Sequence, residues 1–520
     1  MLMMSRPHGT TAGDSDHTRR AGPAPSVRRP TRSAAGPSAA ARSASARPPA
    51  ARSAPARRTA GLVAIVALAV ALILVGAVGV ADARVLPRGI CQPGWYMPYD
   101  DAEKRATLIN EMRTDLRASW VRFEVFWSKA EPSPGVYDDA YLGAVAATVA
   151  EARTAGLKVL ITVFKVPRWA SQKDLWDTPA PGAVKGEYRD FYLPDKGSLP
   201  ALQAFMTHLA GLCGGNVAAY ECWNEPNLWM TLAPQKHGGD TKYAARRYRD
   251  MLKYFRAGVK AAEPQALVVG GAFGPYGPND TWRTSPQRFA RQLKYLGAAR
   301  YFDVLSHHPY QAGVSHRYAP DRLPRWPRRA VSLRNLNVIM RLFPGKPVYL
   351  TEYAYNTRDC PGIGLGVGAT RQADYLRKAY AYAARYSRVK MMLWFLQRDA
   401  GDWSTGLRTA TGTKKPSWYS FSRYTRIGLK LSRAWAPRGG RVKLTGVIRW
   451  TPRGGPTQTV AGKRLVLERK VGSAPWRRVR TLRSNSSGRF TTYVRPKKTT
   501  RYRVRWLGVT GSASRRVLVR

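Results

Sequence analysis

The chain contains the stretch Tyr220-Glu221-Cys222-Trp223-Asn224-Glu225-Pro226, in which an apolar run ends in an asparagine, a carboxylate and a proline. The run begins at Val217 and stops at Pro226, because proline lacks the N–H group that a strand ladder requires. Glu225 therefore lies at the carboxyl end of a predicted strand, between aromatic side chains. In a parallel α/β fold this end of the strand carries the functional groups.

A second carboxylate has the same surroundings further along the chain. Glu352 follows the apolar run Val348-Tyr349-Leu350, with Thr351 before it and Tyr353 after it. Two carboxylates at two strand ends, both among aromatic rings, indicate the cleavage of a glycosidic bond. That reaction needs a proton donor on one side of the sugar and a carboxylate on the other.

Strand and helix patterns alternate on both sides of these carboxylates. Strands are predicted at residues 90–96, 120–127, 159–164, 217–223, 267–271, 302–308, 347–353 and 389–396, with helices at 102–116, 141–155, 199–212, 243–262, 286–296, 333–342 and 371–386. This alternation predicts an α/β protein, a (β/α)8 barrel over residues 84–425. The fourth and seventh strands lie across the mouth of such a barrel, so Glu225 and Glu352 should face each other.

The last segment, residues 426–520, has a different pattern. Short alternating runs between turn signals predict strands at residues 442–444, 464–467, 489–492, 501–506 and 516–519. Apolar residues alternate with arginines, which predicts a small β-sandwich with its arginines outward. The segment resembles the immunoglobulin-like modules of exported actinobacterial proteins.

The N-terminal residues divide into two parts. Residues 1–60 are rich in Arg, Ala, Pro and Ser and bury too little apolar surface to offset ordering entropy, which predicts a disordered cytoplasmic tail. Residues 61–81 are an uncharged apolar run that follows several arginines, which predicts a transmembrane signal-anchor over residues 61–83 with the barrel outside the cell. The alternative is a signal peptide cleaved after Ala83, with a secreted barrel.

The formal net charge of +54 is concentrated at the two ends of the chain. Residues 426–520 contain 26 Lys and Arg but one acid, Glu468. Adhesion to anionic cell-envelope polymers and nucleic-acid binding both fit this excess. The predicted membrane segment favours the first, so no nucleic-acid partner is expected. Compositional drift toward Arg, Ala and Pro contributes to the charge but does not explain the lack of acids in this segment.

The four cysteines, Cys91, Cys213, Cys222 and Cys360, do not have metal-ligand spacing. In an exported protein they could form two disulfides, with three possible connectivities. Buried free thiols are the alternative, which we prefer for Cys222 within its strand. The sequence also lacks phosphate-binding and dinucleotide-binding fingerprints, so neither a metal nor another cofactor is expected.

Several of these residues resemble the signature of glycoside hydrolase clan A. Trp223-Asn224-Glu225-Pro226 matches its fourth strand and Thr351-Glu352 its seventh. Further matches are Arg122 on the second strand, Pro167-Arg168-Trp169 after the third, His308-Pro309-Tyr310 after the sixth and Trp394 on the eighth. The similarity covers residues 88–424 and is closest to the cellulase-like families 5 and 39. It implies a retaining glycosidase on a (β/α)8 barrel.

The resemblance also implies roles for individual residues. Glu225 would be the general acid/base, and its raised pKa would come in part from desolvation by neighbouring rings. Glu352 would be the nucleophile of a double displacement. The implied substrate-binding residues include Arg122 and Tyr310, which would donate to the nucleophile, and Asn224, which would donate to the sugar 2-hydroxyl. Trp394 would be a stacking floor for the sugar, and His308 and Trp169 complete the set.

One departure and one alternative remain. Related sequences often carry a histidine at the end of the third strand, where this chain has Phe164-Lys165-Val166, so its contacts to the sugar should differ from theirs at this position. A catalytically silent carbohydrate-binding or envelope-adhesion protein would share the aromatic residues but would not need both carboxylates.

Overall fold

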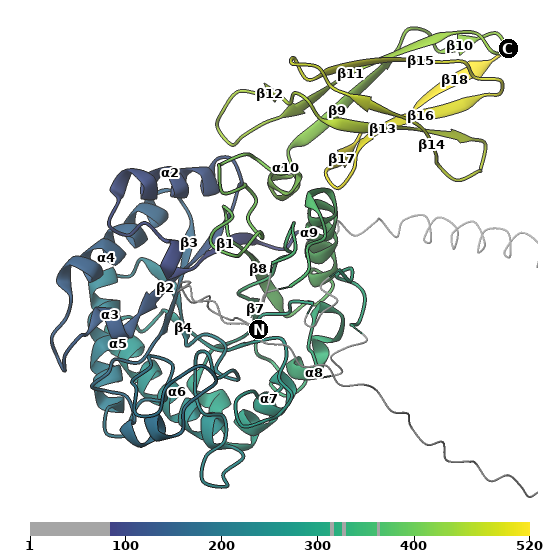
Figure 1. Cartoon of the computed structure of the whole chain (residues 1–520). Coiled ribbons are helices and arrows are strands. Elements are labelled where there is room, and N and C mark those ends of the chain that lie inside the picture. The colour runs from purple at the N-terminus through teal and green to yellow at the C-terminus, as the bar shows by residue number, and fades with distance from the viewer. Residues whose placement is uncertain (1–83, 312–316, 325–328, 361–363) are drawn as a thin grey trace, which may run out of the picture. The chain divides into compact units, whose positions relative to one another are not determined.

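The computed structural model describes residues 84–311, 317–324, 329–360 and 364–520 (Figure 1). The predicted tail at residues 1–60 and the predicted membrane segment at residues 61–83 both lie outside the described residues. Within the described ranges, none of the helices has the length and apolar character needed to cross a membrane.

Eight parallel strands close into a barrel, each paired with its neighbours in chain order and β8 paired with β1 (Figure 1). The strands are β1 Arg88–Gln92, β2 Trp120–Phe126, β3 Lys158–Phe164, β4 Val217–Cys222, β5 Leu267–Phe273, β6 Val304–His307, β7 Val348–Leu350 and β8 Val389–Phe395. The predicted (β/α)8 barrel is confirmed. Because all the strands are parallel, all their carboxyl ends meet at one mouth.

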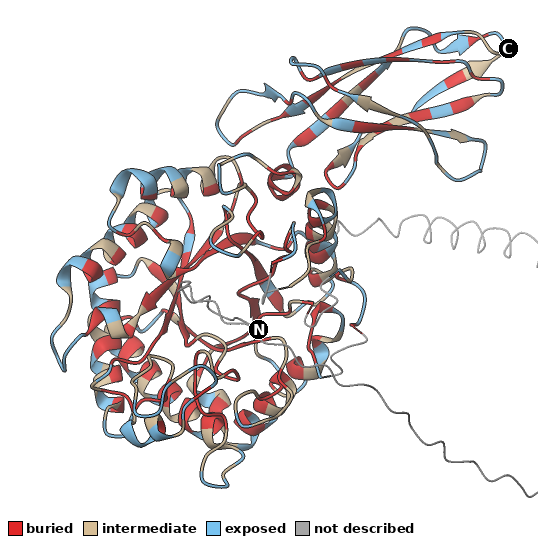
Figure 2. Ribbon diagram, viewed as in Figure 1, coloured by how far each residue is buried: buried red, intermediate tan, exposed pale blue. Residues whose placement is uncertain are grey.

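Helices surround the barrel, and their apolar faces pack inward (Figure 2). They are α2 Ala102–Arg113, α3 Trp127–Ala130, α4 Asp139–Thr154, α5 Leu199–Cys213, α6 Tyr243–Ala262, α7 Pro286–Tyr295, α8 Asn337–Met340, α9 Ala369–Ala383 and α10 Pro416–Ser422, with 3-10 turns η1 Gly94–Tyr96, η2 Lys173–Asp177, η3 Ala298–Tyr301 and η4 Leu333–Asn335. The helix α6 has the predicted bounds. It buries Tyr248, Leu252 and Phe255, which recur at the spacing of one helix face.

Several elements are shorter than predicted, two of them in the last part of the barrel. The predicted helix at residues 333–342 is the turn η4, which the side chains of Ser332 and Asn335 cap reciprocally, followed by the short α8. The strand β7 ends at Leu350. Thr351 and Glu352 therefore lie just beyond the strand, at the barrel mouth.

Residues 425–520 form two β-sheets. One has the strand order β10-β18-β16-β13-β14, with β17 against β16, and the other has β12-β11-β15, with β9 against β11. The bounds are β9 Thr425–Leu431, β10 Trp435–Ala436, β11 Val442–Trp450, β12 Gln458–Thr459, β13 Arg464–Val471, β14 Arg477–Arg483, β15 Arg489–Val494, β16 Thr500–Trp506, β17 Thr510–Gly511 and β18 Arg515–Val519. The prediction missed the two-residue strands β10, β12 and β17 and the longer strands β9 and β14. The four arginines of β14 hide its alternation.

All four cysteines are free and buried in the structure. The possible disulfides are therefore absent from it, and the free-thiol alternative holds for Cys222 and for the other three.

Candidate active site

The structure brings Glu225 and Glu352 together at the mouth of the barrel. Glu225 follows β4 and Glu352 follows β7, and a carboxylate oxygen of each lies within 4.8 Å of the other. The side chain of Glu225 is 14% exposed and that of Glu352 is 9% exposed. Both carboxylates are thus mostly shielded from water, at a separation that one sugar ring can bridge.

The backbone that carries Glu225 is strained. Trp223 has φ 71° and Glu225 has φ 41°, a region that residues other than glycine rarely adopt. Surrounding hydrogen bonds hold this conformation: Glu225 N donates to Ala272 O at 3.0 Å, and Thr231 Oγ1 donates to Glu225 O at 2.7 Å. Strain of this kind persists where the surroundings enforce it, and it concentrates at functional sites.

Arg122 on β2 connects the parts of the site. Its guanidinium is fully buried and donates to three carboxylates: Nε to Glu221 Oε2, and NH1 to Glu124 Oε1 and Glu352 Oε1, each at 2.9 Å. NH2 donates to Asn224 Oδ1 at 2.8 Å. One cation therefore fixes several groups at once. Buried carboxylates need such a partner, because an unpaired buried charge is strongly unfavourable.

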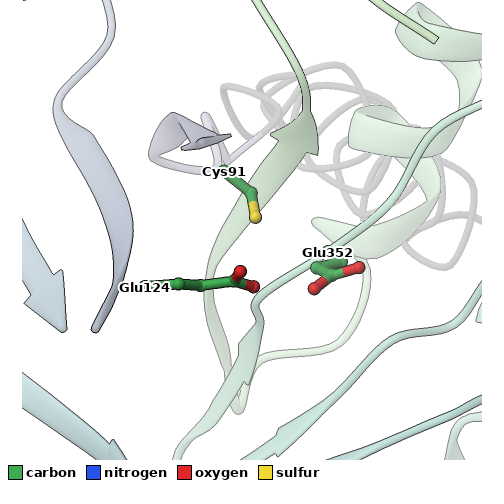
Figure 3. A group of neighbouring side chains, drawn as sticks. All are labelled: Cys91, Glu124 and Glu352. Carbon is green, nitrogen blue, oxygen red and sulfur yellow. The ribbon is translucent and has the colours of Figure 1, made fainter. Parts of the chain in front are cut away.

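Cys91 and the carboxylates of Glu124 and Glu352 gather around one point, as Figure 3 shows. Their ligand atoms lie within 4.8 Å of one another, a spacing that could hold a metal ion. The NH1 atom of Arg122 occupies this point, 3.1 Å from Cys91 Sγ and 2.9 Å from each carboxylate. Burial also raises the pKa of the Cys91 thiol well above its usual range, which disfavours a thiolate ligand. The guanidinium is the cation of this cluster.

Glu352 accepts two hydrogen bonds that hold its carboxylate in place. Arg122 NH1 donates to Oε1 and the Tyr310 hydroxyl donates to Oε2, each at 2.9 Å. Burial raises the pKa of Glu352 above its usual value, although the charges of His308 and Arg122 act in the opposite direction. Arg122 and Tyr310, which the sequence predicted as donors to Glu352, thus both contact its carboxylate.

His308 lies between the two carboxylates. Its Nδ1 atom is 3.0 Å from Glu225 Oε1 and 3.6 Å from Glu352 Oε2, and its Nε2 atom is 3.1 Å from Thr351 Oγ1. Burial acts to lower the pKa of His308, but the carboxylates of Glu352 and Glu225 outweigh it and raise the pKa. These three side chains could also offer ligand atoms to a metal ion, within 4.8 Å of one another.

Asn224 has a defined orientation. Arg122 can only donate hydrogen bonds, so the side-chain atom that faces it must be Oδ1. The Nδ2 group of Asn224 then points away from the guanidinium, and none of the described residues accepts a hydrogen bond from it. This is the orientation that a donor to a sugar hydroxyl requires.

The two predicted tryptophans are less accessible than a sugar platform should be. Trp394 is fully buried, and its indole N–H donates to Thr405 O at 2.9 Å, so the ring has no exposed face for a sugar. Trp169 is half-buried, and its indole N–H donates to Glu131 O at 2.9 Å. Burial argues against Trp394 as a stacking floor, and the role of Trp169 stays a prediction.

An aromatic group that the sequence did not single out lies at the ends of β1 to β3. Trp95 is 55% exposed, and its ring centroid lies 4.8 Å from that of Phe126. The ammonium of Lys165 lies 5.4 Å from the Trp95 ring and 2.7 Å from Asp190 Oδ1. Lys165 lies just after β3, where the sequence departs from the histidine of related sequences, and it contributes a cation beside the exposed ring of Trp95.

Glu221 and Thr351 were likewise not assigned from the sequence. Glu221 is fully buried and accepts hydrogen bonds from Thr162 Oγ1 at 2.7 Å and Thr351 Oγ1 at 3.0 Å. A signal was available, since Glu221 is a carboxylate within an otherwise apolar strand, four residues before Glu225.

Comparison with known proteins found one family model and a set of similar solved structures. Residues 80–399 match the family model for cellulase, glycosyl hydrolase family 5. Similar solved structures include a family 39 glycoside hydrolase from Bacteroides cellulosilyticus WH2, at 18% identity over 79% of this chain and 81% of that chain with a TM-score of 0.47. Another is a GH5_18 protein from Streptomyces cattleya in complex with GlcNAc, at 14% identity over 66% and 80% with a TM-score of 0.48. No curated protein matches the chain.

Proposed function

Because the chain belongs to the cellulase family, glycosyl hydrolase family 5, we propose that it is a retaining glycosidase that cleaves an extracellular polysaccharide or oligosaccharide by double displacement. The family supports glycosidase activity, and the distance between the two carboxylates supports the retaining course. Retaining enzymes hold the carboxyl groups about 5–5.5 Å apart, whereas inverting enzymes need about 6.5–9.5 Å to admit a water molecule. The oxygen atoms of Glu225 and Glu352 within 4.8 Å fit the first arrangement.

In the first step Glu352 attacks the anomeric carbon while Glu225 protonates the leaving oxygen. The bond from the anomeric carbon to that oxygen breaks, and a bond to a Glu352 oxygen forms. The hydrogen bonds from Arg122 and Tyr310 hold the attacking carboxylate in position. In the second step Glu225 takes a proton from water, the resulting hydroxide attacks the anomeric carbon, and the Glu352 carboxylate is released.

The experiment that tests this proposal removes the carboxylate of Glu352. Glu352→Ala should abolish turnover of every aryl glycoside and polysaccharide that the wild type hydrolyses, with the fold intact by circular dichroism. Glu263→Gln is a matched control, because Glu263 is also a buried carboxylate but bonds Gly215 N and Tyr220 OH at the start of β4. Activity that survives in Glu352→Ala would refute the assignment. Glycan binding without release by the wild type would support the silent binding protein instead.

We also propose that residues 61–83 anchor the barrel outside the cell. The support is the uncharged apolar run at residues 61–81 and the arginines before it. Protease added to intact cells should degrade the barrel and leave the tail at residues 1–60 protected. A protected barrel would contradict this topology, and an N-terminus at residue 84 in the mature protein would indicate cleavage.

A third part of the proposal concerns the basic C-terminal sheets, which we propose bind an anionic cell-envelope polymer. Register places Arg501 on β16 directly opposite Arg516 on β18 and Lys470 on β13, on one face. Like charges directly opposite each other destabilise a sheet. The same face carries Arg464, Arg478, Arg483, Arg503 and Arg505 beside Glu468, the one acid of the segment. A polyanion would relieve this repulsion.

Binding of long-chain polyphosphate to the full chain tests this surface. Arg501→Glu should weaken binding at least tenfold and reduce its salt dependence, because phosphate contacts release counterions. Lys430→Glu is the matched control, since it makes the same charge change on β9 of the other sheet. Equal losses in both variants would show attraction by net charge without a docking face. A preference for duplex DNA over polyphosphate would favour nucleic-acid binding.

A further inference from the structure

Two buried residues, Glu221 and Thr351, connect to the side of His308 that faces away from Glu225. Glu221 Oε1 accepts a hydrogen bond from Thr351 Oγ1 at 3.0 Å, and Thr351 Oγ1 lies 3.1 Å from His308 Nε2. Glu221 and Thr351 are both fully buried, so water does not offer these atoms other partners. The three side chains form a single line of hydrogen bonds below the proposed acid/base.

The direction of these hydrogen bonds follows from the chemistry of the groups. Although burial alone would raise the pKa of Glu221, the charge of Arg122 lowers it, so Glu221 is ionised and can only accept. Thr351 has one hydroxyl proton, and it points to Glu221. The remaining bond of Thr351 must then be accepted from His308, which places a proton on Nε2.

We infer that Glu221 and Thr351 are positioning residues that fix the Nε2–H tautomer of His308, so that its Nδ1 atom and Glu225 share the proton used in catalysis. This inference rests on the proposed function. With Nε2 protonated, Nδ1 presents a lone pair to Glu225 Oε1 at 3.0 Å. Loss of the shared proton would leave a carboxylate facing a lone pair, and the pair therefore retains the proton at neutral pH.

The proton balance of the reaction is complete. In the first step the pair releases one proton to the leaving oxygen, which leaves a Glu225 carboxylate beside a neutral His308. In the second step the pair takes one proton from the attacking water and returns to its initial state. Throughout both steps, Nε2 of His308 keeps its own proton, which it donates to Thr351 Oγ1.

Other groups around His308 also affect its protonation. Glu352 after β7 lies 3.6 Å from Nδ1, and the positive charge of Arg122 on β2 opposes protonation of the ring. Further neighbours are Glu221 on β4, Tyr310 on the same loop and His307 on β6. Because the carboxylates outnumber the cation, their combined field keeps a proton on the pair.

Thr351→Val tests the inference, because valine has the shape of threonine but lacks the hydroxyl. Nε2–H then loses its acceptor, and the neutral ring should adopt the Nδ1–H tautomer, which donates to an ionised Glu225. We expect kcat/KM for a phenyl glycoside to fall by about 10²-fold, the scale of a general acid, with the loss growing as the pH rises. Dinitrophenyl glycosides need little acid assistance, so the kcat/KM of the variant for them should fall by less than about twofold.

Two variants control for structural damage. Thr351→Ser keeps the hydroxyl and should restore both the rate on phenyl glycosides and the wild-type pH profile. Thr148→Val makes the same change at a buried threonine of α4, where the hydroxyl donates to Ala144 O, and should change neither substrate's rate. Equal losses on both substrates in Thr351→Val would overturn the inference, because general distortion does not discriminate between leaving groups.

A second measurement does not depend on turnover. In protein labelled with 15N-histidine, the ring nitrogens of His308 report the tautomer directly, and their signals are identified by their loss in His308→Asn. We expect a protonated Nε2 across the neutral range in the wild type and a protonated Nδ1 in Thr351→Val. An Nδ1–H tautomer in the wild type would overturn the inference even if the chain hydrolysed no glycoside. Absence of turnover with the expected tautomer would count against the proposed function alone.

Discussion

Arg122 NH2 donates to Asn224 Oδ1 at 2.8 Å, and this bond turns the amide nitrogen of Asn224 away from the guanidinium. The orientation of the amide therefore depends on a residue two strands away. A donor held in this way is ready before a substrate arrives, which is the condition for a contact that strengthens in the transition state.

The first prediction concerns this donor. Asn224→Ala should lower kcat/KM about 10²–10³-fold on an aryl glycoside that the wild type hydrolyses, the usual loss for one preorganised donor. On the matching 2-deoxy glycoside the variant and the wild type should differ little, because the hydroxyl that accepts the bond is missing. Equal losses on both substrates would mean that Asn224 does not contact the 2-hydroxyl.

The second prediction concerns stability. Arg122→Met leaves three buried carboxylates without their cation and should destabilise the barrel by about 3–5 kcal/mol. Arg256→Met is the control: it breaks a partly exposed pair with Asp303 at 2.7 Å, and the expected loss is at most about 1 kcal/mol. Thermal midpoints in one buffer compare the two variants. Similar thermal midpoints for the two variants would show that the buried carboxylates become protonated when Arg122 is lost.

The third prediction concerns the acid limb of the pH profile. Burial raises the pKa of Glu352, and a nucleophile works only when it is ionised. Activity should therefore decline, as the pH falls, at a higher pH than the value of about 4.3 for an ordinary glutamate would give. The negative charge of Glu225 contributes to this shift, so Glu225→Gln should move the acid limb to lower pH. Rates on a dinitrophenyl glycoside measure it, and an unmoved limb would show that the two carboxylates do not interact.

The fourth prediction concerns a close approach behind Glu225. A Cβ atom at Gly274 would lie 2.5 Å from Leu228 Cδ1 and 3.1 Å from Glu225 Cδ. Gly274→Ala should displace the acid/base and lower kcat/KM by about 10²-fold, as small misplacements do. Gly143→Ala is the control: nothing lies within 4 Å of that Cβ on α4, so activity should be unchanged. Wild-type activity in Gly274→Ala would show that Leu228 can make room for the added Cβ without displacing Glu225.

The sequence predicted those features that depend on local chemistry. The strand β4 ends at Cys222, within one residue of the predicted end, and α6 is read from its apolar spacing. The carboxylate pair follows from the barrel, since parallel strands bring their ends together. The strand β14 was missed because arginine occupies most of its positions, so that its alternation carries little apolar signal.

The unpredicted parts of the site depend on contacts between distant strands. The partners of Glu221 come from β2, from β3 and from beyond β7, and spacing along the chain does not indicate which strand ends touch. The burial of Trp394 is of the same kind, because it depends on where the loop with Thr405 folds back.

The C-terminal segment contains one carboxylate, Glu468, which accepts from Arg503 Nε at 2.6 Å and lies 3.6 Å from Arg505 NH1. All internal charge compensation by side chains in these sheets therefore passes through one residue. Without that carboxylate, as in Glu468→Gln, the strands would meet with uniform repulsion and would need dissolved ions to stay together. The mutant segment should thus become conditionally folded, ordered in concentrated salt and loosened in dilute buffer, while the parent tolerates both.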